Sequence, residues 1–153
     1  LSLGLSGEQL SRNDSALTAG DITAWSLGGS YDLGVAKLLA GYRQSTVDNF
    51  AFASTGADAK RKGYMLAVTA PVGPGLVRAA YNRYQDSQTG TADAKADHFA
   101  IGYIYSLSKR TSVYGTYAYL KNKNGGTRFS INGDAGLDNG KQQGLQVGMT
   151  HAF

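Results

Sequence analysis

The sequence predicts an all-β protein built from about eight antiparallel strands, and three observations support this prediction. First, apolar residues alternate with small or polar residues over stretches of about 9 to 11 residues, the length of a tilted strand that crosses a bilayer. Second, tight turns and long polar loops alternate between these stretches. Third, aromatic residues gather near the ends of the stretches. A period of two places alternate side chains on opposite faces, so each predicted strand has one apolar face.

The last seven residues give the clearest single strand. Val147, Met149, His151 and Phe153 share one face, and the residues between them are small or polar. The same two-sided pattern recurs along the chain back to Leu1. We therefore expect strands over residues 1–9, 22–31, 35–45, 62–71, 76–85, 97–106, 111–121 and 141–153.

The connections between these strands fall into two classes that alternate. Three are tight turns, over residues 32–34, 72–75 and 107–110. The other four are longer and rich in Asn, Asp, Ser, Thr and Gly, over residues 10–21, 46–61, 86–96 and 122–140. Tight turns at one end and long loops at the other are typical of barrels in a bacterial outer membrane.

The aromatic residues indicate that the apolar face meets lipid. A soluble core would hold its aromatic residues in the middle of the strands, where burial is greatest. Here they form two belts at the strand ends, as membrane-water interfaces favour. The predicted girdle comprises Trp25, Tyr42, Tyr64, Tyr81 and Phe99 near the long loops, and Tyr31, Tyr105 and Phe153 near the tight turns. The band between the belts comprises Leu27, Leu38, Ala40, Leu66, Val68, Ala79, Ile101, Val113 and Met149. The pattern predicts a transmembrane antiparallel β-barrel.

The opposite face carries small, polar and basic residues, which suit a water-filled lumen and cannot form a dry core. Lys37, Arg43 and Arg78 are its basic members and are the predicted lumen wall. Three apolar residues, Leu39, Met65 and Ile104, depart from the pattern.

Composition excludes several other classes of protein. The 153 residues are long enough for one domain, 1–153, and the absence of Cys excludes disulfides and thiolate metal sites. Nucleic-acid binding is not expected, because a net charge of +4 is not concentrated in any basic run beyond Lys60–Lys62. No apolar run approaches the roughly 20 residues of a spanning helix. The chain begins at Leu1 without a visible signal peptide.

At this point the chain resembles the general porins of Gram-negative bacteria, in particular the trimeric beta-proteobacterial type. The resemblance rests on the turn at 106–111 (Ser-Leu-Ser-Lys-Arg-Thr) followed by a Tyr-rich strand, on residues 31–37 with 40–43, and on residues 147–153. It covers essentially the whole chain and matches the C-terminal half of such a porin. The resemblance implies about eight strands of a sixteen-stranded barrel, with the N-terminal strands outside this chain.

The resemblance also implies a function and a set of partners. It implies a homotrimer in the outer membrane that lets small hydrophilic solutes and ions diffuse through a water-filled channel, with no cofactor and no catalysis. The expected partners are outer-membrane lipid, lipopolysaccharide and the barrel-assembly machinery. The expected assembly signal is Val147, Met149, His151 and Phe153. The basic residues of the lumen wall suggest a mild anion preference.

Two alternatives of other classes stay open at this point. A small closed eight-stranded outer-membrane barrel, acting as an adhesin, an anchor or a lipid-modifying enzyme, fits the same length; its interior must be filled by side chains, however, and the polar face is dominated by small ones. A soluble all-β binding module is the other alternative.

Individual residues also suggest three more specific sites: a catalytic site, a calcium site and a phosphate contact. His98, with Asp97 and Ser106 nearby in sequence, is a weak candidate for hydrolysis, because neighbouring residues in a strand face apart. Residues 132–140 hint at a calcium loop but lack the spacing and the Glu of an EF-hand. Lys60–Lys62 could contact lipopolysaccharide phosphates at the membrane boundary.

Overall fold

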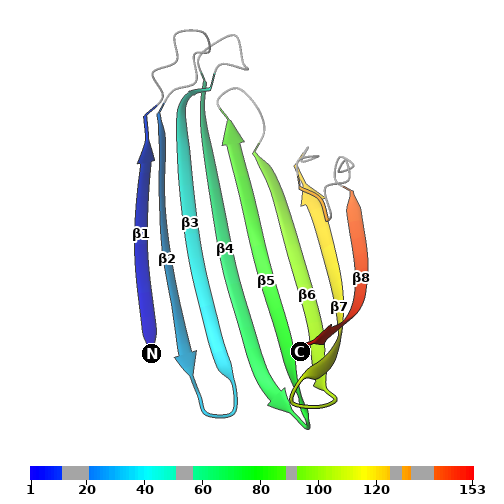
Figure 1. The fold of residues 1–153 in the computed structure, drawn as a ribbon. Coiled ribbons are helices and arrows are strands. Elements are labelled where there is room, and N and C mark those ends of the chain that lie inside the picture. Colours follow the sequence, from blue (N-terminus) through cyan, green and yellow to red (C-terminus); the bar gives the residue numbers. More distant parts are fainter. Residues whose placement is uncertain (12–20, 51–56, 89–92, 125–128, 132–139) are drawn as a thin grey trace.

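A computed structural model describes residues 1–11, 21–50, 57–88, 93–124, 129–131 and 140–153 of the chain. These residues form one antiparallel sheet of eight strands, in which every strand pairs with its neighbours in sequence (Figure 1). The strands are β1 (Ser2–Leu10), β2 (Ile22–Asp32), β3 (Lys37–Phe50), β4 (Ala57–Val72), β5 (Gly75–Gln88), β6 (Ala94–Ser106), β7 (Thr111–Lys123) and β8 (Lys141–His151). The predicted all-β class and the eight strands are confirmed.

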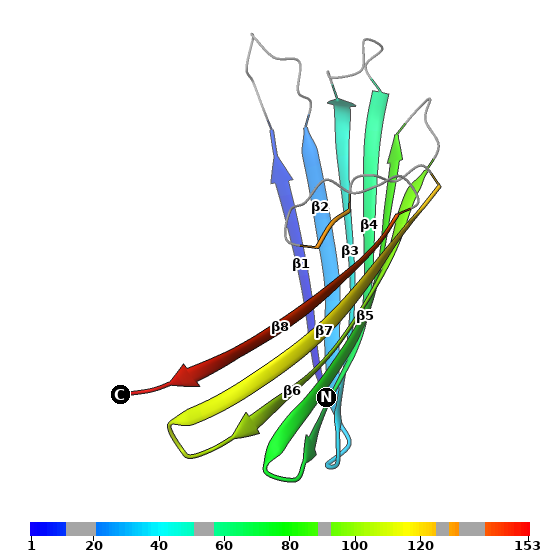
Figure 2. The same ribbon diagram turned by 90° about the vertical axis from the view of Figure 1, so that its right-hand side faces the viewer.

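The sheet is curved and open. Figure 2 shows β6, β7 and β8 swinging away from the direction of β1 to β5. β1 pairs only with β2 and β8 only with β7, so the two described edge strands do not close the sheet on each other. The alternative of a small closed eight-stranded barrel is therefore wrong for this structure. No helix in the described residues is long and apolar enough to span a membrane.

Several strands extend further toward the long-loop end than predicted. β3 continues to Phe50, β4 starts at Ala57 and β5 continues to Gln88. The predicted loops 46–61 and 86–96 were therefore too long. Backbone pairing such as Thr46 with Lys60 continues where polar residues interrupt the apolar face, so the apolar alternation used to find strands gives no signal there.

The tight turns lie at one end of the sheet and depend on two glycines. Gly34 and Gly73 adopt positive φ angles of 82° and 57°. In the first turn, the backbone N–H of Gly34 donates to Oδ1 of Asp32 at 2.7 Å. In the second turn, Gly73 is followed by Pro74, and the flanking residues pair directly, as in a two-residue hairpin with positive φ at its first position.

The third turn, residues 107–110, is held by the side chain of Ser108. Its Oγ accepts the backbone N–H groups of Arg110 at 3.2 Å and Thr111 at 3.0 Å. The backbone N–H of Ala152 donates to the carbonyl of Arg110 at 2.9 Å, which ties the end of β8 to the same turn.

The sheet has two chemically different faces and no conventional apolar core. We call the side that carries Trp25 and Leu27 the apolar face, and the side that carries Ser26 and Gly28 the polar face. The apolar face leaves large side chains exposed, with Leu66 at 62% and Leu145 at 77%. The buried residues lie on the polar face, toward the long-loop end. They are Ala24, Ala59, Asp86, Ala94, Ala96, Leu120 and Asn122.

The turn at Gly73 yields a testable prediction. Replacing Gly73 by Ala forces an L side chain into the left-handed region, which costs roughly 1 to 2 kcal/mol. We expect Gly73→Ala to lower the urea midpoint of the refolded protein in detergent. Gly115→Ala is the matched control, because an added Cβ there meets no atom within 4 Å. Equal midpoints for the two variants would contradict the argument.

Candidate functional site

The polar face gathers the residues that the sequence assigned to it. The cross-strand register places each of them on one side of the sheet, with Ser26 opposite Arg43 and Arg43 opposite Gly63 as an example. The predicted apolar band lies on the other side, with Leu38 opposite Val68. The exceptions Leu39, Met65 and Ile104 lie on the polar face, and nothing in the structure explains them.

The predicted basic residues of the polar face stand at two levels. Lys37 pairs with Thr69, which pairs with Arg78, so Lys37 and Arg78 share one row across the sheet. Their backbones lie two strand spacings apart, roughly 10 Å. Arg43 lies six residues further along β3, roughly 20 Å toward the long-loop end. The structure thus brings Lys37 and Arg78 together and separates Arg43 from them.

A groove on the polar face surrounds Arg43 and contains charges that the sequence analysis missed. Its walls include Ser26, Arg61, Tyr84 and Asp86. Arg61 Nε lies 3.4 Å from Oδ2 of Asp86, whose side chain is nearly buried. Asp86 fell in a predicted loop, so its parity was not considered.

Residues 129–131, in the connection between β7 and β8, lie on this polar face. The Phe129 ring stacks on the Tyr84 ring, with centroids 5.5 Å apart and planes 20° apart. Asn122 Nδ2 donates to the carbonyl of Phe129 at 2.9 Å, and the backbone N–H of Ile131 donates to Oε1 of Gln142 at 2.7 Å. These contacts hold a short segment against the inner surface of β5, β7 and β8. The sequence predicts a polar loop over 122–140, and the lone aromatic residue Phe129 is its one signal for such a contact.

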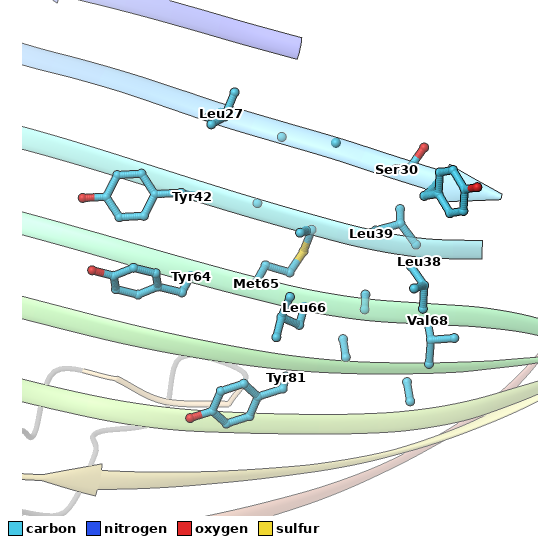
Figure 3. A pocket seen from close by; sticks show the side chains of 18 of the residues that line it. Leu27, Ser30, Leu38, Leu39, Tyr42, Tyr64, Met65, Leu66, Val68 and Tyr81 are labelled. Carbon is cyan, nitrogen blue, oxygen red and sulfur yellow. The ribbon is translucent and has the colours of Figure 1, made fainter. Parts of the chain in front are cut away.

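The upper aromatic belt of the apolar face is continuous. The Trp25 and Tyr42 ring centroids lie 4.9 Å apart, and those of Tyr42 and Tyr64 lie 5.0 Å apart. Figure 3 shows Tyr42, Tyr64 and Tyr81 on consecutive strands, with their hydroxyl groups pointing toward the long-loop end. Below them lies an apolar groove whose walls include Leu38, Leu66 and Val68. Tyrosines at a membrane interface have this orientation, with the ring in the apolar zone and the hydroxyl toward water.

The belt at the turn end contains the predicted Tyr31 and Tyr105 and one residue that was missed. Tyr103 lies 6.4 Å from Tyr105 between ring centroids, and its hydroxyl donates to the carbonyl of Val72 at 2.8 Å. At the end of β8, the Phe153 ring meets the His151 ring edge-on at 5.2 Å. Nδ1 of His151 lies 2.9 Å from Oγ1 of Thr111.

Three weaker hypotheses have different outcomes. Lys60–Lys62 does not act as one cluster, because Arg61 faces Asp86 on the polar face while its neighbours face the other way. His98 contacts Asn82, at 3.2 Å between Nδ1 and Nδ2, and Asp97 lies on the opposite face. Ser106 is eight residues along β6 from His98, roughly 26 Å away, so the three groups do not assemble.

The suggested calcium loop, 132–140, lies almost wholly outside the described residues. Within the part of the chain that the structure describes, no three His, Cys, Asp or Glu side chains are grouped so that they could hold a metal ion.

Comparison with known proteins decides the family. The profile of the Gram-negative porin family matches residues 1–125. The chain belongs to the Gram-negative porin family. It is 38% identical to outer membrane porin protein 32 of Delftia acidovorans, an alignment that covers 99% of this chain and 42% of the relative. It is 30% identical to an outer membrane porin protein of Bordetella pertussis, over 100% of this chain and 43% of the relative.

The structure of a porin also matches. An anion-selective porin from Comamonas acidovorans superposes with a TM-score of 0.76 and 37% identity, covering 99% of this chain and 44% of that porin. The chain thus spans less than half the length of the relatives it matches. Family membership places this porin in the outer membrane. The predicted resemblance, fold class and localisation are confirmed.

Ala79 and Ala80 test the assignment of the two faces. They are neighbours on β5, and they face the apolar and the polar side, opposite Ile101 and Ala100 respectively. If the apolar face meets lipid, Ala79→Lys places a charge near the bilayer midplane and destabilises the porin by about 2 to 4 kcal/mol. Ala80→Lys is the matched control and should fold almost as well as the parent. Urea unfolding in lipid vesicles measures the difference; equal stability would contradict the assignment.

Proposed function

We propose that this chain forms the C-terminal half of a barrel domain through which small hydrophilic solutes and ions diffuse passively, with anions mildly favoured. The observation that carries the proposal is the polar face, where Lys37 and Arg78 share one row with Thr69 and Gly102. Asp32 stands opposite Lys37 in the same row, so the row as a whole keeps a net charge of one cation, which fits a mild preference. Gly, Ala and Ser leave space for water next to these charges. No residue performs chemistry, and no cofactor is needed.

The apolar face supports the same proposal from the outside. In our proposal its band lies in the hydrocarbon, with the two aromatic belts at the interfaces. The open edges of β1 and β8 need partners, because lipid cannot satisfy free backbone groups. About eight further strands of the same protein would pair with them. The proposed assembly is a homotrimer, with outer-membrane lipid, lipopolysaccharide and the assembly machinery as its other partners.

The expected anion preference is mild on physical grounds. A unit charge acts on an ion about 10 Å away in a water-like medium with roughly 0.4 kcal/mol, which is below thermal energy. Two such residues at one level bias the passing ions without trapping them. The Arg61–Asp86 pair, nearly neutral in sum, adds little to that bias. The similarity to a porin named for anion selectivity supports the proposal.

Charge removal tests the pore-lining role. We expect Lys37→Gln with Arg78→Gln to move the reversal potential of the whole porin, measured in a planar bilayer under a salt gradient, toward cations. The control variant, Lys60→Gln with Lys109→Gln, removes the same charge from the apolar face of β4 and from the turn at 107–110. This variant should leave the reversal potential unchanged. A parent channel that prefers cations, or identical shifts in both variants, would refute the proposed role.

We also propose that Val147, Met149, His151 and Phe153, on the apolar face of β8, are the surface that the assembly machinery contacts. The Phe153 side chain is fully exposed, and its ring contact among the described residues is with His151, so it adds little to folding stability. Phe153→Ala should therefore reduce the heat-modifiable porin in outer membranes several-fold while leaving its urea midpoint unchanged. Ala152→Ser is the control on the opposite face. Equal membrane levels of the two variants would count against the assembly role.

A further inference from the structure

A cluster of basic residues lies on the apolar face, at the long-loop end of β4 to β8. The cluster occupies two rows of residues that pair across neighbouring strands. Lys62, Gln85, Lys95 and Lys123 form the outer row, and Arg83, Asp97, Lys121 and Lys141 form the row below. We call the six basic residues and Asp97 in these rows the basic rim.

Like charges face each other directly across strands in this rim. Lys95 is the partner of Lys123, and Lys121 is the partner of Lys141. Directly opposed like charges destabilise a sheet unless an opposite charge lies between them. The arrangement therefore costs free energy in the bare protein, and that cost disappears when an anion sits between the ammonium groups.

Asp97 neutralises only one part of the rim. Its Oδ2 accepts Lys123 Nζ, its Oδ1 lies 3.5 Å from Arg83 Nε, and Tyr81 donates its hydroxyl to Oδ1 at 2.7 Å. Among the described residues, no carboxylate lies within ion-pair distance of Lys121 or Lys141. Within the described residues, this second pair therefore has no carboxylate placed to offset it.

The rim lies immediately outside the upper aromatic belt. The next row toward the tight turns is Tyr81, Phe99 and Tyr119, and the row after that is Ala79, Ile101 and Tyr117. A lipid with its acyl chains along the apolar band would have its head group at the level of the rim, since aromatic belts mark the interface. Basic residues at this depth attract anionic lipid.

We propose that Lys121 and Lys141, supported by Lys62 and Lys95, bind the phosphate groups of a phosphorylated glycolipid in the outer leaflet, the lipid A part of lipopolysaccharide. Each lysine acts as a point charge on phosphate oxygen. Asp97 holds Arg83 and Lys123 in place beside this site. This inference rests on the proposed contact between the apolar face and lipid. It adds which residues bind the lipid head group and that they recognise its phosphates.

The test measures binding of fluorescent bisphosphorylated lipid A to the whole porin in detergent. We expect Lys121→Gln with Lys141→Gln to weaken binding about 30-fold, as removal of two lysines near an anionic lipid implies. Lys121→Arg with Lys141→Arg keeps the charge and should bind within about threefold of the parent. Lys109→Gln with Arg110→Gln removes the same charge at the opposite end of the strands and should bind like the parent. Heat-modifiable migration of every variant verifies folding.

Two further binding measurements, with dephosphorylated lipid A and with inorganic phosphate, identify the ligand. Dephosphorylated lipid A should bind the parent as weakly as lipid A binds the double Gln variant, whereas equal binding of both lipids would overturn the proposal. Inorganic phosphate should compete only at millimolar concentration or above; potent competition would show a free-phosphate site and overturn the lipid assignment. The double Gln variant should keep the conductance and reversal potential of the parent. A failure of the lipid-binding proposal can therefore be distinguished from a failure of the pore proposal.

Discussion

The pairing of backbone N–H and C=O groups is the constraint on which the rest of this structure depends. Hydrocarbon offers no partners for these groups, so each strand within a membrane must pair along its whole length with a neighbour. Strands β2 to β7 meet this requirement with a neighbour on each side, whereas β1 and β8 each leave one edge to be paired. Because a strand alternates its side chains, the same pairing divides the sheet into an apolar face and a polar face.

This division replaces the packed core of a soluble protein. Large apolar residues are exposed on one face, and the few buried residues are mostly Ala under the long-loop end of the other. On the apolar face, the charged rows begin where the upper aromatic belt ends. Asp97 lies at this boundary, where a carboxylate can still organise Arg83, Lys123 and the Tyr81 hydroxyl.

The sequence predicted the features that depend on alternation. The two faces of each strand and the placement of Lys37 and Arg78 on the polar face follow from a period of two. The sequence did not predict the strand ends where apolar and polar residues no longer alternate. At the long-loop end of β3 and β4 the regular apolar alternation is interrupted by residues such as Thr46 and Lys60, so the pattern no longer distinguishes strand from loop. The contact between Phe129 and Tyr84 joins residues distant in sequence, and no local pattern encodes it.

The inward placement of residues 129–131 has a consequence for how such a channel diversifies. The segment is held by a ring stack and two hydrogen bonds and takes no part in the ladder of the sheet. Substitutions there change the shape of the inner surface without altering strand register or the contacts with lipid. A lineage can therefore adjust the shape of the proposed pore by substitutions at a few positions, while the strand pairing of the wall stays the same.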